Sequence, residues 1–261
     1  MSRLILALSV LFLFSCSRTS SADYYRQRAW AADETRVETH TIEKRELSAH
    51  PYRRENDSSQ LEEKRATDGY SALKVLEAGN SRFTQDSAVH PRQDKLRREE
   101  LKATQNPHTA VLSCSDSRVS PELVFDQGIG DLFVVRTAGE VADPAAVASL
   151  EYAVEHLGVK MILIMGHTSC GAVKTTLSLG SEKSAGSKDL DKLVAAIRPN
   201  IKSFDLTSAG PGLEHAVRAQ VNGVADGLLK RSKIINEASE KHGLRISRAI
   251  YNLDTGTVDF W

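Results

Sequence analysis

Residues Val159 to Met165 form an almost continuous apolar run that leads almost directly into His167. A central strand of a parallel sheet has this pattern, because both of its faces are covered and neither alternates with polar residues. A second apolar run, Thr109 to Leu112, is closely followed by Cys114. We therefore expect two buried strands, with Cys114 and His167 just past their carboxyl ends, where ligands bind in open α/β sheets.

Helical and strand patterns alternate along the rest of the chain. We expect helices near Ala72 to Phe83 (with Gly79-Asn80 as a stop signal), from Pro121 after Ser120 as N-cap, from Pro144 to Leu157 and from Ala216 to His242, a strand at Leu132 to Val135, and a hairpin of Ile246 to Tyr251 with Thr257 to Phe260. Ser178 to Asp191 is polar and contains glycine, so we expect a loop there. The alternation predicts an α/β fold, a mainly parallel β-sheet flanked by helices. We also expect an N-terminal helical arm.

The first residues indicate export. An apolar run from Leu4 to Phe14 follows a basic residue and is too short to span a bilayer, but it suits the core of a signal peptide. It ends in Leu13-Phe14-Ser15-Cys16, which resembles a bacterial lipobox. We expect residues 1–15 to be a lipoprotein signal peptide and a lipid on Cys16 to anchor the chain in a membrane. Ser17 replaces the aspartate that retains lipoproteins at the inner membrane, so we expect a periplasmic lipoprotein of the outer membrane. An ordinary signal peptide with an incidental cysteine is the alternative.

Residues 16–66 are dense in charged residues of both signs and contain few large apolar ones, too few to offset the entropy of ordering. We expect a flexible charged spacer; an arm that packs on a partner subunit is the alternative. The remaining residues, 67–261, would form one folded domain.

The net charge of the whole chain is balanced. Lys plus Arg equals Asp plus Glu at 34 each, so charge predicts no nucleic-acid partner.

Cysteine and histidine occur at metal-ligand spacing in two motifs, Cys114-Ser115-Asp116-Ser117-Arg118 and His167-Thr168-Ser169-Cys170. Zinc prefers thiolate and imidazole ligands, and catalytic zinc sites use three protein ligands and leave one position open. Cys114, His167 and Cys170 would supply these three. Asp116 is close enough in sequence to coordinate the metal too, or to stand beside the open position.

A disulfide between Cys114 and Cys170 is the alternative in an exported protein. It would contribute about 2–4 kcal/mol, whereas zinc in comparable sites contributes about 10–16 kcal/mol at neutral pH. A disulfide also leaves His167, Asp116 and Arg118 without a role, so we favour zinc. The four-ligand spacing of a zinc finger is absent.

In this order and spacing, the two motifs resemble the signature of the β-class carbonic anhydrases, Cys-x-Asp-x-Arg followed by His-x-x-Cys. The resemblance covers Asp68 to Trp261 and includes Ala72-Leu73 through Asn80-Ser81-Arg82-Phe83, Gly130 through Arg136, and Glu151 through Val154. It implies that Cys114, His167 and Cys170 bind Zn²⁺ and that Asp116 and Arg118 form the catalytic dyad.

The resemblance also implies a substrate pocket. The residues that match it are Gln105, Phe133, Tyr152 and Gly171. Glu140, in Ala138-Gly139-Glu140, stands where many members have asparagine or histidine, a departure that affects the pocket wall. Members are typically dimers or multiples of dimers with the site near an interface. We therefore expect a homodimer or higher homo-oligomer that uses the helix around Leu73.

The implied function is reversible hydration of carbon dioxide to bicarbonate and a proton, the lyase reaction of a carbonic anhydrase, by a hydroxide that zinc generates at neutral pH. Asp116 would orient this hydroxide and Arg118 would hold Asp116 off the metal, whereas a freed Asp116 would bind zinc and close the site. One alternative is hydrolysis of carbon disulfide or carbonyl sulfide on the same fold. Another is a catalytically silent zinc- or bicarbonate-binding lipoprotein, against which the presence of both Asp116 and Arg118 argues.

Overall fold

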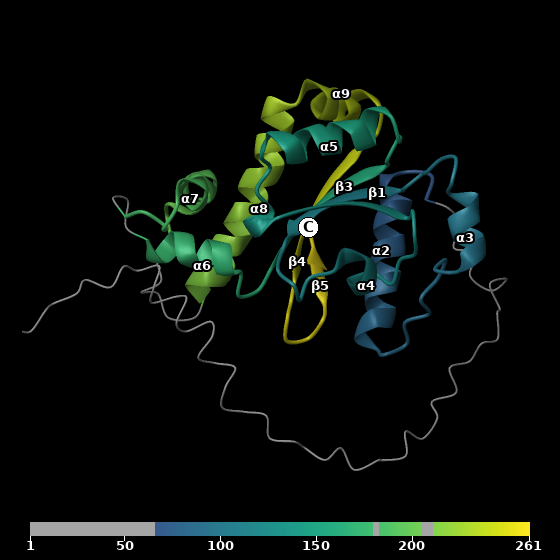
Figure 1. Cartoon of the computed structure of the whole chain (residues 1–261), viewed down its shortest axis with the longest axis horizontal. Helices are drawn as coiled ribbons and strands as arrows, with labels where there is room; N and C mark the ends of the chain where they lie inside the picture. The colour runs from purple at the N-terminus through teal and green to yellow at the C-terminus, as the bar shows by residue number, and fades with distance from the viewer. Residues whose placement is uncertain (1–65, 180–182, 205–210) are drawn as a thin grey trace, which may run out of the picture. The chain divides into compact units, whose positions relative to one another are not determined.

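The computed structural model describes residues 66–179, 183–204 and 211–261 (Figure 1). The predicted signal peptide at 1–15, Cys16 and the spacer up to residue 65 lie outside these residues. Ala66, which we assigned to the spacer, is buried among core side chains that include Leu76. The folded body therefore includes the last residue of the predicted spacer.

A five-stranded sheet forms the centre of the described body, in the order β2-β1-β3-β4-β5. In chain order the strands are β1 Thr109–Cys114, β2 Leu132–Thr137, β3 Met161–His167, β4 Arg245–Tyr251 and β5 Val258–Phe260. The first four are parallel to their neighbours, and β5 runs antiparallel to β4. Every residue of β1 and β3 is buried. The predicted mainly parallel sheet, with two fully covered strands, is confirmed.

Helices cover both faces of the sheet (Figure 1). They are α2 Gly69–Thr84, α3 Lys95–Glu100, α4 Pro121–Val124, α5 Pro144–Glu155, α6 Gly171–Ser178, α7 Lys188–Ile201, α8 Pro211–Arg231 and α9 Lys233–Lys241, with a 3₁₀ turn, η1, at Ala138–Glu140. Ala110 and Leu112 of β1 pack in one core with α5, α8 and α9, whereas Val111 packs in the other with α2 and α4. Successive side chains of a strand point to opposite faces, so each covered strand contributes to both cores.

Helix α2 continues through Gly79-Asn80, where we expected it to stop. That expectation is wrong because both residues make contacts with distant segments. A Cβ on Gly79 would lie 1.7 Å from the carbonyl oxygen of Phe125, so the glycine lets the helix pack directly against that backbone. The Asn80 amide is buried and donates to the carbonyl oxygens of Val124 and Gly256. Tertiary contact, not helix termination, accounts for these two residues.

The helix around Leu73, which we expect at the interface between subunits, is α2. Leu73 is buried in the chain's own core together with Ala72 and Leu76. Its apolar side chain is therefore already used within the chain. Tyr70, on the same helix, is 63% exposed.

Two helical regions differ from the expected ones. Helix α7 begins at Lys188, inside the expected loop, where Ser187 caps it by accepting from the backbone N–H of Leu190 at 3.2 Å. The single helix expected from Ala216 to His242 is two helices, because Ser232 interrupts it and caps α9. In both cases a serine N-cap marks the start of the helix.

Candidate metal centre

Three potential metal ligands meet at the carboxyl edge of the sheet. Cys114 and His167 are the last residues of β1 and β3, which pair in parallel and so end side by side. Cys170 follows a tight turn in which Ser169 has a φ of 59°, and it immediately precedes α6. The ligand atoms of the three residues lie within 4.8 Å of one another, and all three are buried. Both cysteines are free thiols in the described part of the chain, so the structure contains the metal-ligand trio and not the disulfide.

The hydrogen bonding of His167 leaves one ring nitrogen available to a metal. Nδ1 lies 2.8 Å from the carbonyl oxygen of Thr168. A carbonyl only accepts, so Nδ1 carries the proton and donates it. In the neutral imidazole Nε2 is then the acceptor, and it is buried and without a hydrogen-bond partner among the described residues. A bound metal would satisfy this nitrogen, and a histidine ligand held through its other nitrogen is the usual arrangement at metal sites.

A zinc ion fits these donors. Zinc–sulfur bonds of about 2.3 Å and zinc–nitrogen bonds of about 2.0–2.1 Å place donor atoms about 3.5–4 Å apart in a tetrahedron, within the 4.8 Å limit of the trio. A hydrogen bond from the Cys170 thiol lowers the pKa of Cys114, and the same bond together with burial raises the pKa of Cys170. The metal-free pair therefore keeps a proton. Zinc ligates thiolates, so its binding releases that proton.

Arg118 holds the carboxylate of Asp116 beside the metal ligands. Its backbone N–H and its Nε donate to Oδ1 at 3.0 and 2.9 Å, and its Nη2 donates to Oδ2 at 2.8 Å. The Arg118 side chain is the main cause that keeps the pKa of Asp116 well below its ordinary value, so the carboxylate is ionised at neutral pH. Oδ2 lies 3.8 Å from Nε2 of His167. Asp116 thus lies beside the ligand trio while Arg118 holds its carboxylate.

Arg136, near the end of β2, braces the loop that carries this dyad. Its Nε donates to the carbonyl oxygen of Cys114 at 3.1 Å, and its Nη2 donates to that of Asp116 at 2.6 Å. We had assigned this arginine no role from sequence. The feature that could have identified it is its place in the sheet. The register of β1 with β2 pairs Arg136 with Ser113, the residue directly before Cys114.

The turn η1 packs against Cys114. The backbone N–H of Gly139 donates to Sγ of Cys114 at 3.4 Å. Gly139 has a φ of 63°, and a Cβ there would lie 2.9 Å from Cδ1 of Ile197, so the position favours glycine. Glu140 is fully buried, and neither carboxylate oxygen has a partner in the described ranges. Burial, and secondarily the charge of Cys114, raises the pKa of Glu140 well above its ordinary value. The chain itself therefore encloses the carboxyl group of Glu140.

Of the four predicted substrate-binding residues, Gly171 alone adjoins the metal ligands. It follows Cys170 as the first residue of α6 and is exposed. A Cβ built on it would meet no atom within 4 Å. The space next to this ligand is therefore open in the described structure.

The other three predicted pocket residues lie at the opposite end of the strands. Gln105 is exposed and precedes the amino end of β1. Phe133 pairs with Ala110 near that same end, and its ring centroid lies 6.4 Å from that of Tyr152. At about 3.3 Å per residue, the strand separates Ala110 from Cys114 by about 13 Å. One chain therefore does not bring Gln105, Phe133 or Tyr152 to its own metal ligands.

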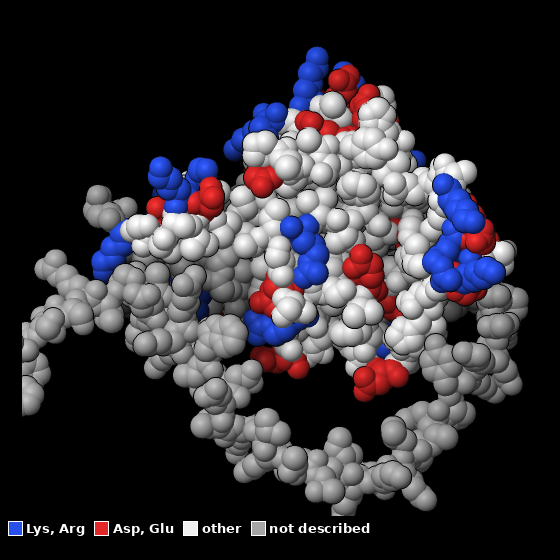
Figure 2. Space-filling model, viewed as in Figure 1, with Lys and Arg blue, Asp and Glu red and all other residues white. Residues whose placement is uncertain are grey.

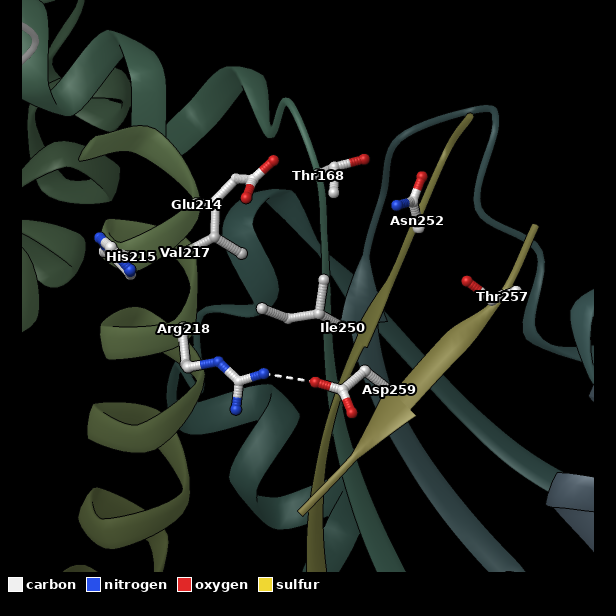
Figure 3. Close-up of a pocket in the computed structure, with 9 residues that line it drawn as sticks. All are labelled: Thr168, Glu214, His215, Val217, Arg218, Ile250, Asn252, Thr257 and Asp259. Carbon is white, nitrogen blue, oxygen red and sulfur yellow. Dashed lines mark hydrogen bonds and ion pairs between the residues drawn. The ribbon is translucent and has the colours of Figure 1, made fainter. Parts of the chain in front are cut away.

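A pocket of about 350 Å³ lies beside the metal-binding loop (Figure 3). Its lining comes from α8, the β4–β5 hairpin and the loop after β3: Thr168, Glu214, His215, Val217, Arg218, Ile250, Asn252, Thr257 and Asp259. An ion pair joins Arg218 to Asp259 within it. None of the candidate ligands or dyad residues lines this pocket, so it is not the site of the chemistry.

Comparison with known proteins agrees with this geometry. The family model for carbonic anhydrases matches residues 109–258. The chain is 41% identical over 192 residues to a carbonic anhydrase of Mycolicibacterium smegmatis, an alignment that covers 72% of this chain and 91% of the relative. It is 37% identical over 193 residues to carbonic anhydrase 2 of Mycobacterium tuberculosis, which covers 73% and 91%.

Solved structures show the same fold. The β-carbonic anhydrase CcaA superposes with a TM-score of 0.57 at 28% identity, over 72% of this chain and 94% of that one. The β-carbonic anhydrase CafA of Aspergillus fumigatus superposes with a TM-score of 0.55 at 28% identity, over 74% and 89%. With the Cys114, His167 and Cys170 trio at the edge of this sheet, the chain belongs to the carbonic anhydrase family, in its β class.

Proposed function

We propose that this chain catalyses the reversible hydration of carbon dioxide to bicarbonate and a proton, with Zn²⁺ held by Cys114, His167 and Cys170. When bound, zinc supplies the Lewis acidity that lowers the pKa of a coordinated water to about 7. The observation that carries the proposal is the ionised Asp116 carboxylate, held 3.8 Å from the unpaired Nε2 of His167. A structural zinc site is closed by four protein ligands and needs no such neighbour.

Asp116 and Arg118 have separate roles in this proposal. Oδ2 of Asp116 accepts a hydrogen bond from the attacking water and so directs a lone pair of its oxygen at the carbon of the substrate. Arg118 keeps the carboxylate in place through three hydrogen bonds, two of them to one oxygen. Because those bonds also hold Asp116 away from the ligand trio, Arg118 keeps the fourth position free.

Carbon dioxide is uncharged, and the face shown in Figure 2 has no charged patch that would indicate a charged substrate instead. On the face shown in Figure 2, small groups of Lys and Arg side chains and of Asp and Glu side chains are separated by uncharged surface. A polyanion such as nucleic acid needs a basic patch or stripe. The face shown has none.

The positions of Gln105, Phe133 and Tyr152 support a homodimer or a higher homo-oligomer. These residues can contact substrate at a metal site only when a second copy supplies them, because within one chain they lie at the far end of β1. Tyr152 is 48% exposed, so its ring is available to another chain. We infer that each metal site is completed by the pocket residues of its partner.

The experiment is stopped-flow hydration of carbon dioxide by purified protein, with sedimentation at each concentration used. We expect rapid hydration that a zinc chelator abolishes and Zn²⁺ restores, and a fall in specific activity where dilution yields monomers. Consumption of carbon disulfide by zinc-loaded protein that leaves carbon dioxide unchanged would favour the sulfur substrates instead. Full activity of a monomer would contradict the shared pocket.

We also propose that the protein is exported and anchored to the outer membrane through a lipid on Cys16. The support is the Leu13-Phe14-Ser15-Cys16 pattern after a short apolar run. No helix among the described residues is long and apolar enough to cross a bilayer.

We expect Cys16→Ser to move the protein from the membrane fraction to the soluble fraction, or to leave it unprocessed, while the zinc content per folded chain stays the same. Unchanged membrane retention of Cys16→Ser would contradict the anchor.

A further inference from the structure

A line of hydrogen bonds connects helix α7 to the metal ligand Cys114. Nδ2 of Asn200 donates to Oε1 of Gln220, and Nε2 of Gln220 donates to the carbonyl oxygen of Gly139, both at 2.9 Å. The backbone N–H of Gly139 then donates to Sγ of Cys114 at 3.4 Å. Gln220 has no exposed surface. Both ends of its amide are therefore satisfied inside the protein, as buried polar groups require.

The direction of these bonds follows from the groups involved. A backbone carbonyl only accepts, so the amide nitrogen of Gln220 must face Gly139. The amide oxygen of Gln220 then faces Asn200, which must present its own nitrogen. The orientation of both side-chain amides is thus determined by the carbonyl of the turn that contacts the metal ligand.

The turn η1 needs restraint from outside. Gly139 and Glu140 are consecutive residues in the left-handed region, with φ of 63° and 43°. For a non-glycine residue such as Glu140 this conformation is strained, and it persists only where the surrounding structure enforces it. The hydrogen bond from Gln220 holds the carbonyl group of Gly139, which belongs to the peptide bond between these two residues. It therefore supplies part of the restraint that keeps the turn in this conformation.

Two glycines let α8 reach this position. A Cβ on Gly223 would lie 2.2 Å from Cγ of Asn200, so glycine admits the Asn200 amide against the helix. A Cβ on Gly166 would lie 2.8 Å from Val221, so glycine also lets α8 pack on the end of β3, directly before His167. The two close approaches place Gln220 of α8 within reach of the turn on Cys114.

We propose that Gln220 is a positioning residue of the metal site: it holds Gly139 so that its N–H donates to the thiolate of Cys114. A hydrogen bond to a ligating sulfur withdraws charge from it and so leaves the metal a stronger Lewis acid. The effect matters here because two of the three ligands are thiolates, which donate more charge than imidazoles. The inference rests on the zinc site of the proposed function but not on the identity of the substrate.

The test compares Gln220→Met, which keeps the length of the side chain but cannot donate, with Val224→Ala. Val224 is a buried residue of the same helix that packs in the core with α5 and α9, so its truncation lowers stability without touching η1. We expect Gln220→Met to bind zinc about 10–100-fold more weakly in competition with a chelator. In cobalt-substituted protein, we expect the sulfur-to-metal charge-transfer band to move to lower energy. Val224→Ala should leave both unchanged.

Asn200→Ala provides a milder variant in case Gln220→Met does not fold. It removes the donor to Oε1 of Gln220 and should shift the band in the same direction by a smaller amount. A band and a zinc affinity that stay at wild-type values in Asn200→Ala, or in a folded Gln220→Met, would overturn the proposal. If the variants show the expected changes in zinc affinity and in the cobalt band but the wild-type protein does not hydrate carbon dioxide, the proposed function is contradicted and this inference stands.

Discussion

Replacing Cys170 with serine is expected to reduce bound zinc from about one ion per chain to background, and carbon dioxide hydration with it. Serine keeps the shape of cysteine but has no thiolate, and only Cys114 and His167 would remain of the three ligands that meet within 4.8 Å. Zinc sites of this ligand type contribute about 10–16 kcal/mol, so loss of one ligand removes most of the affinity. Metal analysis of protein purified without added zinc, alongside a hydration assay, measures both effects.

Val173→Ala is the matched control for that variant. Val173 is a fully buried residue of α6, the helix that follows Cys170, and it packs in one core cluster with Cys114 and Cys170 without offering a donor atom. Val173→Ala should be less stable but keep its zinc. The comparison therefore separates the effect of losing a ligand from the effect of destabilising the fold. Detection of a Cys114–Cys170 disulfide in active wild-type protein would show that the sulfur atoms do not serve as zinc ligands.

The parallel sheet and the metal ligands could be predicted from sequence because their signals are local. The apolar run Val159 to Met165 has the composition of a strand covered on both faces, and His167 follows it after one glycine. Two ligands at the ends of paired parallel strands must lie close together, whatever the rest of the chain does. The fold class and the Cys114, His167 and Cys170 trio were therefore predicted correctly.

The features that could not be predicted from sequence depend on contacts between distant segments of the chain. Gly79 has the pattern of a helix stop, but its lack of a side chain serves close packing on the backbone of Phe125. The departure at Glu140 was visible, yet nothing local showed that the chain would enclose the carboxyl completely. The roles of Gln220 and Arg136 likewise depend on which backbone atoms the fold brings to them. Composition and periodicity do not contain that information.

The predicted pocket shows a different limit. Matching Gln105, Phe133 and Tyr152 to family positions assigns them a role but not a subunit. The parallel register of β1 and β2 puts Phe133 level with Ala110, about 13 Å along the strand from Cys114. Only this geometry supports the proposal that a second chain supplies them.

Asp116→Asn should keep its zinc and lose at least about 100-fold in kcat/KM, the scale of losing one positioned catalytic group. The amide has the shape of the carboxylate but only one accepting oxygen, whereas Arg118 donates to both Oδ1 and Oδ2. If the amide oxygen takes the place of Oδ1, an N–H₂ group replaces Oδ2 and points a donor at Nη2 of Arg118 and at the attacking water. All three ligands remain, so metal content should not change.

Two further variants separate charge from position. Asp143→Asn removes the same charge from an exposed N-cap, a position that asparagine fills equally well, and should leave hydration unchanged. Arg118→Ala keeps the carboxylate but releases it at 3.8 Å from Nε2 of His167, close enough to become a fourth ligand. Its activity should fall at neutral pH and recover partly at high pH, where hydroxide competes with the carboxylate, whereas Asp116→Asn should show no such recovery. Near-normal hydration by zinc-loaded Asp116→Asn would mean that Asp116 is only a neighbour of the metal, and the assignment of the dyad would have to be abandoned.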